Sequence, residues 1–327
     1  MTTLKPYKFK PYLKTVIWGG DKIATYKGIH TELERVGESW EISSVQGHES
    51  VCGDRGIAND PDKGLTLYQI IDKYREALVG NATFARYGKQ FPLLVKIIDS
   101  RQDLSIQVHP NDELAQKRHN CAGKTEMWYI MQTEPGAKIY AGLKKQITPD
   151  EYEQLALKKV EEGENPFADV IASYDSHEGD SFFLPAGRLH AIGAGNLLAE
   201  IQQTSDITYR VYDYGRRDAD GHTRELHVEQ AKAAIDYRVF DDYRTSYDRE
   251  SRSTELVACP YFTVRREIVE NGAHIDYNRD SFVIVMCLSG QVTINGVAAR
   301  QGETLLVPAC NAAMDIEGNA TLLTATM

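Results

Sequence analysis

Two histidines and a glutamate are the residues of this sequence best suited to chemistry. His109 ends a segment of alternating polar and apolar residues, Glu126 begins an apolar segment, and His190 follows a Pro-Ala-Gly turn. Two imidazoles and one carboxylate, with a fourth position left to water, form a usual catalytic zinc site. The same trio suits non-haem iron, so the ligand types alone do not select the metal. Taken singly, each residue is more often structural, and the metal site is predicted from their joint occurrence in one β unit.

The segment that ends at His109 places further polar groups beside this histidine. Residues 104–109 alternate strictly between apolar and polar types. Successive side chains of a β-strand point to opposite faces, so Ser105, Gln107 and His109 are expected to share one face. The side-chain amide of Gln107 would add a hard oxygen ligand to the site.

Charged residues follow the same pattern in the other candidate segments. Lys124 is two positions before Glu126, and the two are expected on one face of a strand. Glu200 and Arg210 follow His190 along the chain. The remaining histidines have no comparable context and are expected to be structural: His30, His48, His119, His177, His222, His227 and His274.

The framework that positions these groups consists of short strands separated by Gly, Pro, Asn and Asp. Many short strands bounded by turn residues predict an all-β sandwich or barrel. The segments with this pattern are 93–98, 104–109, 127–131, 181–184, 197–203 and 207–212.

Helical patterns are few and read as inserts or connectors. Residues 67–78 carry apolar residues at helical spacing after a possible N-cap, Thr66. A second helix is predicted to begin at Pro149, because Thr148 and Glu151 form a capping-box pattern around it. A third is expected within residues 227–237.

An internal repeat predicts two related units. Residues 179–186 and 302–309 share the order glycine, acidic residue, apolar strand, then Pro-Ala. The first copy continues to His190, whereas the second continues through Cys310 without a histidine. Self-similarity of this kind favours duplication of one β unit over chance recurrence of turn chemistry. We therefore predict a catalytic domain at 1–245 and a C-terminal domain without metal ligands at 246–327, joined through the polar residues 241–255.

Composition excludes several classes of function. The formal net charge of −10 and the lack of a local Lys/Arg cluster argue against nucleic-acid binding. No run of about 18 apolar residues predicts a membrane span, and the N-terminus lacks the apolar core of a signal peptide. The five cysteines are widely spaced and odd in number, which indicates reduced thiols and a cytoplasmic protein.

Several of these segments, in this order, resemble the type I mannose-6-phosphate isomerases, and the resemblance covers essentially the whole chain. The match to the short bacterial branch of that family rests on residues 16–20 and 37–41, and the match to the family as a whole on residues 105–110, 124–126, 185–191 and 205–210. The resemblance implies a mainly β fold of two cupin-like (jelly-roll) barrels with a small helical insert. It also implies interconversion of mannose 6-phosphate and fructose 6-phosphate through an enediol, by a monomer or weak homodimer.

The resemblance assigns roles to individual residues. It implies one zinc ion per chain, bound by His109, Glu126 and His190, with Gln107 as a further ligand in some members. It implies an active-site role for Arg210, which would serve either the phosphate or the developing oxyanion. It also places Glu200, Lys124, Ser105 and Lys96 in the pocket. We take Glu200 and Lys124 as first and second candidates for the proton-transferring base, and Ser105 and Lys96 as substrate-binding residues. Independently of the resemblance, Trp18 and Trp40 are candidate pocket residues, Trp18 as a substrate-binding residue, and an aromatic core role is at least an equal alternative for both.

The chain departs from longer members of the family at two points. Those members have a histidine immediately before the lysine that matches Lys124, and here that position is Gly123. A mechanism that uses this histidine as the base therefore does not apply to this chain. The spacing from His190 to Arg210 is one residue longer than in those relatives, which affects the alignment of Glu200 and Arg210.

Two other functions compete with the isomerase. An iron-dependent oxygenase could use the same two histidines and carboxylate, although the cations Lys124 and Arg210 favour a sugar phosphate. A non-catalytic sugar-binding cupin would be expected to have a degenerate metal site, whereas the first copy of the repeat is intact.

Overall fold

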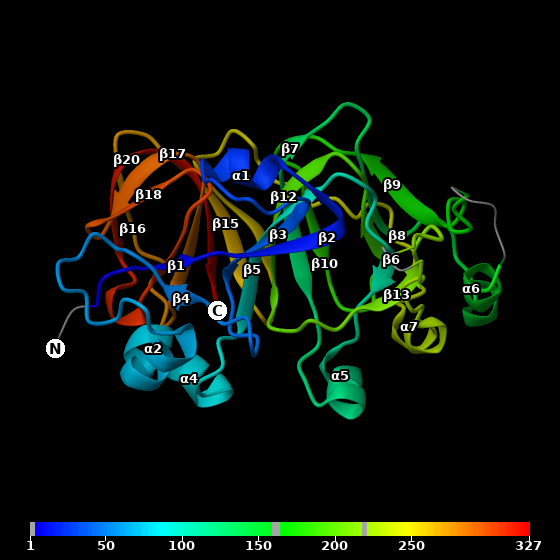
Figure 1. Cartoon of the computed structure of the whole chain (residues 1–327), viewed down its shortest axis with the longest axis horizontal. Coiled ribbons are helices and arrows are strands. Elements are labelled where there is room, and N and C mark those ends of the chain that lie inside the picture. The colour runs from blue at the N-terminus through cyan, green and yellow to red at the C-terminus, as the bar shows by residue number, and fades with distance from the viewer. Residues whose placement is uncertain (1–3, 159–163, 218–220) are drawn as a thin grey trace.

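The computed structural model describes residues 4–158, 164–217 and 221–327 and is built from three β-sheets with short helices at the periphery (Figure 1). The pairings between the named strands are antiparallel, so the predicted mainly β class is confirmed. Within the described residues no helix is both long and apolar enough to span a membrane.

Two of the sheets face each other and enclose the candidate site. The central sheet contains, in spatial order, β10 (Ser181–Leu184), β7 (Glu126–Thr133), β12 (Asn196–Gln203), β5 (Leu93–Ser100), β2 (Tyr12–Gly20) and β3 (Val36–Ile42). The outer sheet contains β13 (Tyr209–Tyr212), β6 (Ile106–Val108), β11 (His190–Ile192), β8 (Lys138–Leu143) and β9 (Ile171–Asp175). A core that includes Trp128, Ile139 and Phe182 fills part of the space between them.

The third sheet, here called the C-terminal sheet, contains most of the last part of the chain. Its strands are β14 (Ser253–Ala258), β15 (Thr263–Val269), β16 (Ala273–Ile275), β17 (Val283–Ile294), β18 (Val297–Arg300), β19 (Thr304–Val307), β20 (Met314–Thr326), β1 (Tyr7–Lys10) and β4 (Val51–Cys52). Tyr7 of β1 pairs with Leu306 of β19, so the start of the chain completes the sheet formed by its end. The division at residue 245 stays a prediction, and strands from before it contribute to this sheet.

The helices are short and lie outside the sheets. They are α1 (Lys22–Lys27), α2 (Leu67–Tyr74), α3 (Glu76–Val79), α4 (Asn81–Tyr87), α5 (Asp112–His119), α6 (Pro149–Ala156), α7 (Val228–Ala234) and the 3₁₀ helix η1 (Ala309–Asn311). Thr66 caps α2 and the capping box at Thr148 forms, both as predicted. Gln69 completes a further capping box at Thr66. The single helix expected at 67–78 is wrong in one respect, because Arg75 adopts φ 50° and divides it into α2 and α3.

The central sheet is buried on both faces, and this position explains the composition of its inner strands. Val95 and Ile97 of β5 belong to a core shared with the C-terminal sheet, which includes Phe262 and Ile284. Lys96 lies between them in sequence and therefore points to the opposite face, toward the outer sheet. A single strand thus supplies both the contact between the two halves of the molecule and a charged group of the candidate site.

The two copies of the sequence repeat form similar local structures. Gly179 and Gly302 both adopt positive φ, of 82° and 80°, and each precedes a short strand, β10 or β19. After its proline the first copy continues into β11, which begins with His190, whereas the second enters η1. The same turn and strand are therefore followed by a candidate ligand in only one copy.

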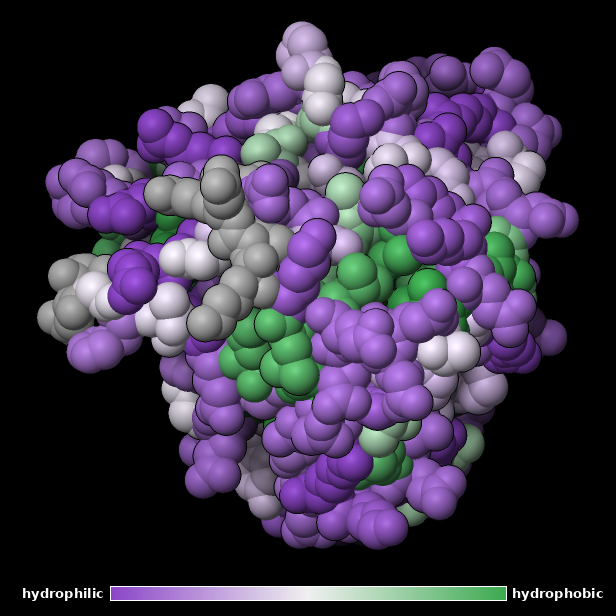
Figure 2. Space-filling model, turned by 90° about the vertical axis from the view of Figure 1, so that its right-hand side faces the viewer, coloured by the Kyte–Doolittle hydropathy of each residue, from purple (hydrophilic) through white to green (hydrophobic). Residues whose placement is uncertain are grey.

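The face that carries α6 and α7 is mostly hydrophilic. Figure 2 shows this face with small hydrophobic areas separated by hydrophilic side chains. Large apolar side chains with substantial exposure include Leu157, Leu226, Val239 and Phe240. Scattered exposure of this kind is ordinary for a globular protein and requires no partner.

Candidate active site

Three strand ends bring His109, Glu126 and His190 together. His109 directly follows β6, Glu126 is the first residue of β7, and His190 is the first residue of β11. His190 pairs with Gln107 across β11 and β6, which places the ends of these two strands side by side. The three side chains therefore come from both sheets and meet between them.

The three side chains form a compact buried cluster, here called the ligand cluster. Each of the three residues is 1% exposed. Nε2 of His190 lies 3.2 Å from Oε1 of Glu126, and Nε2 of His109 lies 3.4 Å from Oε2 of the same carboxylate. One candidate ligand atom from each residue lies within 4.8 Å of the others, a spacing at which one cation can contact all three.

The backbone around the cluster fixes which imidazole nitrogen faces the carboxylate. Nδ1 of His109 lies 3.0 Å from the carbonyl oxygen of Ile207, and Nδ1 of His190 lies 2.8 Å from that of Arg188. A carbonyl only accepts, so each Nδ1 carries the hydrogen and each Nε2 presents a lone pair. This is the arrangement in which a histidine binds a metal while its other nitrogen donates to a second group.

The atoms that face one another in the ligand cluster make no hydrogen bond with the described residues, and Oε2 of Glu126 has an ion pair with Lys124 at 3.2 Å. Nε2 of both histidines and both carboxylate oxygens of Glu126 are buried without a hydrogen bond among the described residues. Burial of so many unpaired polar atoms is costly unless a ligand satisfies them. The residues therefore fit a divalent cation such as zinc.

Protonation states in the cluster also suit a cation. Burial, together with the nearby Lys124 ammonium, lowers the pKa of His109 to about 3. Burial likewise lowers the pKa of His190. Burial alone would raise the pKa of Glu126, but Lys124 and the two histidines hold it well below the ordinary value. At neutral pH the three groups are two neutral imidazoles and a carboxylate, the forms that bind metal.

A polar pocket of about 400 Å³ lies beside the ligand cluster. Lys124 connects the two, because it lines the pocket and its Nζ lies 3.2 Å from Oε2 of Glu126. The structure places in the wall of this pocket the other residues that the sequence and the resemblance singled out: Trp18, Lys96, Ser105, Gln107, Lys124, Glu200 and Arg210.

Two carboxylates and a lysine form a buried row on one side of the pocket. Nζ of Lys96 lies 3.2 Å from Oε1 of Glu200 and 3.3 Å from Oε2 of Glu38. Trp128 Nε1 donates to Oε2 of Glu200, and Trp40 Nε1 donates to Oε2 of Glu38, each at 2.8 Å. The indole donors hold the two carboxylates on either side of Lys96.

The two carboxylates of this row differ in their affinity for a proton. Burial and the negative charge of Glu126 raise the pKa of Glu200. Burial also acts on Glu38, but Lys96 and Lys14 outweigh it and lower the pKa of Glu38 to about 2. Glu200 is consequently the carboxylate of the row with the greater affinity for a proton and the better candidate for proton transfer.

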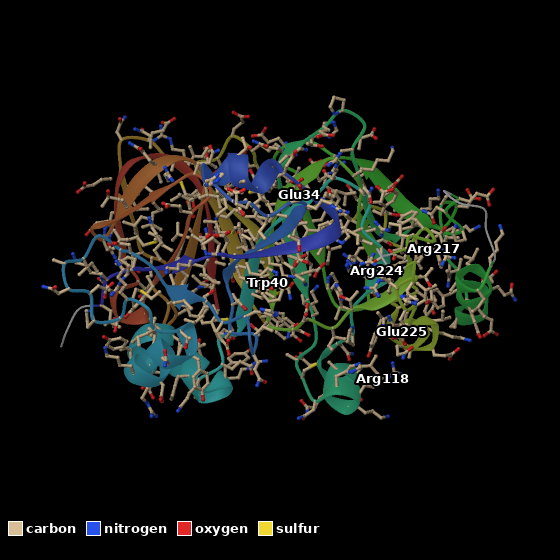
Figure 3. All side chains as sticks on the ribbon, viewed as in Figure 1. Glu34, Trp40, Arg118, Arg217, Arg224 and Glu225 are labelled. Carbon is tan, nitrogen blue, oxygen red and sulfur yellow. The ribbon has the colours of Figure 1, made fainter. Side chains whose placement is uncertain are left out.

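Arg210 presents unused donors to the pocket. Its Nη1 donates to the carbonyl oxygen of Glu225 at 2.9 Å, while its buried Nε has no hydrogen-bond partner among the described residues. Arg224 lines the same pocket and pairs with Asp213. Figure 3 shows Arg224 and Glu225 near β13, the strand that carries Arg210.

Sequence reasoning missed several pocket residues, which are Lys14, Glu38, Asp206, Thr208 and Arg224. A signal was present for Glu38, because it shares a strand face with Trp40, which the sequence had marked as a possible pocket residue. Trp40 itself is buried, and its ring centroid lies 5.2 Å from Lys96 Nζ.

Steric crowding explains why a glycine, Gly123, precedes Lys124. A Cβ at Gly123 would lie 2.6 Å from the carbonyl carbon of Asn111 and from the backbone nitrogen of Asp112. Lys124 N–H also donates to the carbonyl oxygen of Pro110 at 3.1 Å, which fixes this close approach. The backbone here leaves no room for the histidine of the longer relatives.

Comparisons with known proteins agree along the whole chain. A family model described as phosphomannose isomerase type I, catalytic domain, matches residues 7–156. Mannose-6-phosphate isomerase ManA of Bacillus subtilis is 34% identical over 97% of this chain and 98% of its own length. A mannose-6-phosphate isomerase of Streptococcus mutans is 31% identical over 93% of this chain and 92% of its own.

Solved structures show the same fold. The crystal structure of the mannose 6-phosphate isomerase from Bacillus subtilis matches with a TM-score of 0.84 at 30% identity, covering 99% of this chain and 100% of that chain. A structure of a phosphomannose isomerase mutant from Salmonella typhimurium matches with a TM-score of 0.82 at 14% identity, covering 98% of this chain and 99% of that one, which supports the fold alone.

Proposed function

The chain belongs to the type I phosphomannose isomerase family, and from this premise we propose that it interconverts mannose 6-phosphate and fructose 6-phosphate in the pocket beside the ligand cluster. The observation that carries the proposal is the set of unpaired, buried ligand atoms of His109, Glu126 and His190, which border a pocket lined by cations and carboxylates. A sugar phosphate requires such cations, and an aldose–ketose isomerase requires a proton-transferring group.

We propose that the resident metal is one zinc ion per chain, held by His109, Glu126 and His190. Gln107, whose Cα is opposite that of His190 in the outer sheet, is our candidate for a further oxygen ligand. When bound, zinc supplies a Lewis acid that polarises the sugar carbonyl and stabilises negative charge on the enediolate oxygens.

Glu200 is our candidate for the base that moves the proton. In the forward direction it takes the proton from C2 of mannose 6-phosphate and returns it to C1. A second proton passes from the O2 hydroxyl to O1, and the two transfers together convert the aldose into the ketose. Its Oε2 accepts from Trp128, and its Oε1, which makes no hydrogen bond with the described residues, lies 3.2 Å from Nζ of Lys96, so the carboxylate is oriented. Burial and the negative charge of Glu126 raise the pKa of Glu200, which makes it a stronger base than an ordinary carboxylate. Lys124 is the second candidate for this role.

We assign the phosphate to Arg210. Lys96 is paired with two carboxylates and Lys124 with Glu126, so their charges are largely compensated within the protein. Arg210 has no carboxylate within ion-pair distance among the described residues and keeps its Nε free for an acceptor. A guanidinium with unused donors is well suited to bind a phosphate.

The proposed reaction is tested by a coupled assay for fructose 6-phosphate formation from mannose 6-phosphate. We expect activity to disappear after chelation and to return when zinc is added. A folded, zinc-loaded sample without turnover would contradict the proposal. Oxygen uptake by an iron-loaded sample would then identify the oxygenase, and binding of the sugar without turnover would identify a sugar-binding cupin.

We further propose a cytoplasmic protein that acts as a monomer or weak homodimer. All five cysteines are free thiols, as in a reducing compartment. Analytical ultracentrifugation across a range of protein concentrations tests the proposed state of association.

A further inference from the structure

Residues 225–227, which do not line the pocket, form hydrogen bonds with Arg210 of β13. The backbone N–H of Arg210 donates to Nδ1 of His227 at 3.1 Å, and the backbone N–H of His227 donates to the carbonyl oxygen of Arg210 at 2.7 Å. The guanidinium of Arg210 donates to the carbonyl oxygen of Glu225 at 2.9 Å. Residues 225 and 227 therefore bind both the backbone and the side chain of Arg210.

The side chain of His227 is used for β13 and not for the helix that begins after it. His227 is the N-cap residue of α7, and its side chain makes no capping hydrogen bond. The imidazole instead accepts a hydrogen bond from the backbone N–H of Arg210 on β13. The residue at the start of α7 therefore holds β13 in place and does not cap the helix with its side chain.

The hydrogen bond also defines the protonation state of His227. A ring nitrogen accepts only when it carries no hydrogen, so Nδ1 is unprotonated and the hydrogen of the neutral ring is on Nε2. A protonated ring would carry a hydrogen at Nδ1, directed at the backbone N–H of Arg210. It would also place a positive charge next to the guanidinium.

We propose that His227 is a positioning residue for Arg210, which in its neutral form holds the guanidinium in place for the phosphate of the substrate, and whose protonation weakens substrate binding. The proposal rests on the proposed function, because it requires Arg210 to bind the sugar phosphate.

The surroundings of His227 support a neutral ring at neutral pH. The titratable and charged groups that face it, directly or from α5 across Tyr209, are Glu225 on its own segment, Arg210 and Tyr209 on β13, and His119 and Arg118 on α5. Burial lowers the pKa of His227 from its ordinary 6.5; Glu225 opposes the shift, and Arg210 and His119 add to it. The ring thus gains its proton at a lower pH than an ordinary histidine.

Two substitutions of similar size separate this role from a general structural one. In His227→Asn the side-chain amide occupies the position of Nδ1, can accept from Arg210 and does not titrate. In His227→Gln the amide reaches the position of Nε2 and leaves the Arg210 N–H without its acceptor. His274→Asn is the matched control, because His274 is largely exposed and pairs with Asp315 on the C-terminal sheet.

The kinetic measurement is kcat/KM for mannose 6-phosphate from pH 5 to 8, together with zinc content and melting temperature. We expect His227→Gln to lower kcat/KM about tenfold at neutral pH, mainly through KM, with zinc retained. We expect His227→Asn to stay within about threefold of wild type and to lose one ionisation from the acid limb. Titration of the substrate phosphate is common to all variants. Equal kcat/KM for the Asn and Gln variants, or an unchanged acid limb in His227→Asn, would overturn the proposal.

A second measurement does not depend on activity. Two-bond ¹H–¹⁵N correlation spectra of the imidazoles, assigned with the His227→Asn variant, distinguish the two neutral tautomers. We expect His227 to be protonated at Nε2 alone at neutral pH; a ring protonated at Nδ1 would overturn the proposal. If the wild type does not turn over mannose 6-phosphate, the proposed function fails, and the spectra still decide whether His227 accepts from Arg210.

Discussion

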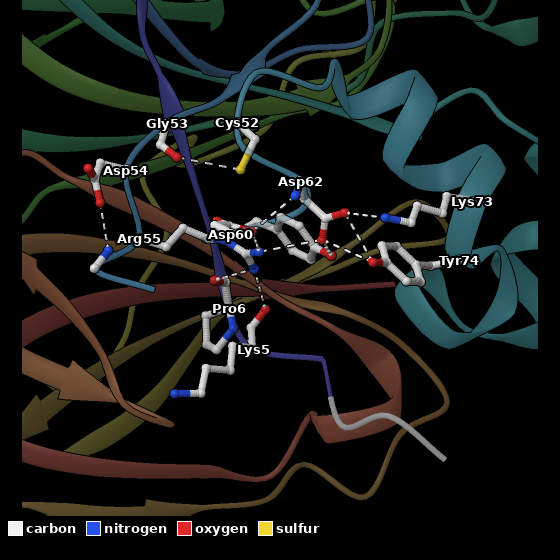
Figure 4. A network of polar contacts seen from close by, with 12 residues as sticks. Lys5, Pro6, Cys52, Gly53, Asp54, Arg55, Asp60, Asp62, Lys73 and Tyr74 are labelled. Carbon is white, nitrogen blue, oxygen red and sulfur yellow. Dashed lines mark hydrogen bonds and ion pairs between the residues drawn. The ribbon is translucent and has the colours of Figure 1, made fainter. Parts of the chain in front are cut away.

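Two buried clusters of ionisable side chains differ in whether their polar atoms have hydrogen-bond partners within the protein. The ligand cluster lies between the central and outer sheets. The second cluster, here called the clamp, contains Arg55, Asp60 and Asp62 and lies beneath β1 (Figure 4). Arg55 Nε donates to Asp60 at 2.6 Å, and Arg55 Nη1 donates to the carbonyl oxygen of Lys5 at 3.2 Å.

The carboxylate of Asp62 is the centre of the clamp. It accepts from Tyr7 at 2.9 Å, from Lys73 at 2.7 Å and from Tyr74 at 3.0 Å. The Arg55 guanidinium also stacks 4.2 Å from the ring centroid of Tyr7. The charged groups at the centre of the clamp therefore have partners within the protein.

The difference shows how a structural cluster of buried charges is distinguished from a ligand-binding one. Both clusters contain carboxylates that are almost fully buried, so burial does not separate them. The number of hydrogen bonds does. The carboxylates of the clamp accept several, whereas two nitrogens and two oxygens of the ligand cluster make none with the described residues. A closed network contributes to the fold, whereas an open one requires a ligand. Substitutions in the two clusters are therefore expected to affect different measurements.

The largest effect is expected from His190→Ala, which removes one of the three side chains of the open cluster. Activity should fall by about a thousandfold or more, because a Lewis acid contributes several kcal/mol to the transition state. Zinc per chain, measured by mass spectrometry of the purified protein, should fall with it. The control is His274→Ala at the exposed His274–Asp315 pair, and retention of full zinc by His190→Ala would contradict the assignment.

Glu200→Gln tests the proton-transferring group and leaves the ligands in place. We expect kcat to fall by about 10²–10⁴-fold, the usual contribution of general acid–base catalysis. Zinc content should stay at the wild-type value, since the amide oxygen still accepts from Trp128. If kcat were close to wild type, Lys124 would become the first candidate and Lys124→Met the next variant to measure.

Asp62→Ala tests the closed cluster. The substitution leaves Lys73 without a carboxylate, removes the acceptor of Tyr7 and Tyr74, and leaves Arg55 with Asp60 alone. It should lower the free energy of unfolding by about 3 kcal/mol. The kcat of the folded protein should be unchanged at a temperature well below its melting point. Asp54→Ala is the matched control, because Asp54 forms an exposed pair with Lys63 and its loss should change the free energy of unfolding far less. Urea unfolding measures both, and equal losses would show that the clamp does not stabilise the fold.

The smallest effect is a pH dependence within the clamp. The hydrogen bond from Arg55 holds the pKa of Asp60 below its ordinary value of 3.8. The contribution of the Asp60 carboxylate to stability is therefore complete above the pKa that Asp60 has in the unfolded chain. It is lost as the pH falls through the lower pKa that Asp60 has in the folded protein. The difference in unfolding free energy between wild type and Asp60→Asn should be constant above about pH 5 and shrink below about pH 4. A difference that did not depend on pH would exclude this linkage.

Sequence reasoning was most effective where the evidence was local. The candidate ligands lie at the ends of strands whose alternation is visible along the chain, and their meeting point follows from antiparallel pairing. Helix α5 was not predicted, because only Ala115 is buried in it and it has almost no apolar face. The break at Arg75 was also missed, since neither glycine nor proline marks it.

Contacts between distant segments were beyond the sequence. Glu38 meets Lys96 because β3 pairs with β5, and no motif connects these two positions. His227 was expected to be structural, because the sequence around it shows no candidate ligand pattern. Its hydrogen bond with Arg210 forms only because the fold places the start of α7 beside β13. The resemblance to a family supplied roles for pocket residues, but it did not supply the residues that hold those groups in position.

The pairing of β1 with β19 has a consequence for the timing of synthesis. Lys8 and Glu303, which join these strands, are separated by 295 residues. A ribosome that adds about 5–20 residues per second needs roughly 15–60 s to make that length of chain. During this interval β1 has no partner on its β19 edge, and an unpaired strand can associate with other chains. The clamp, whose side chains lie within the first 74 residues, can already hold β1 against its own half of the molecule, and we expect Asp62→Ala to aggregate more during expression than its stability alone accounts for.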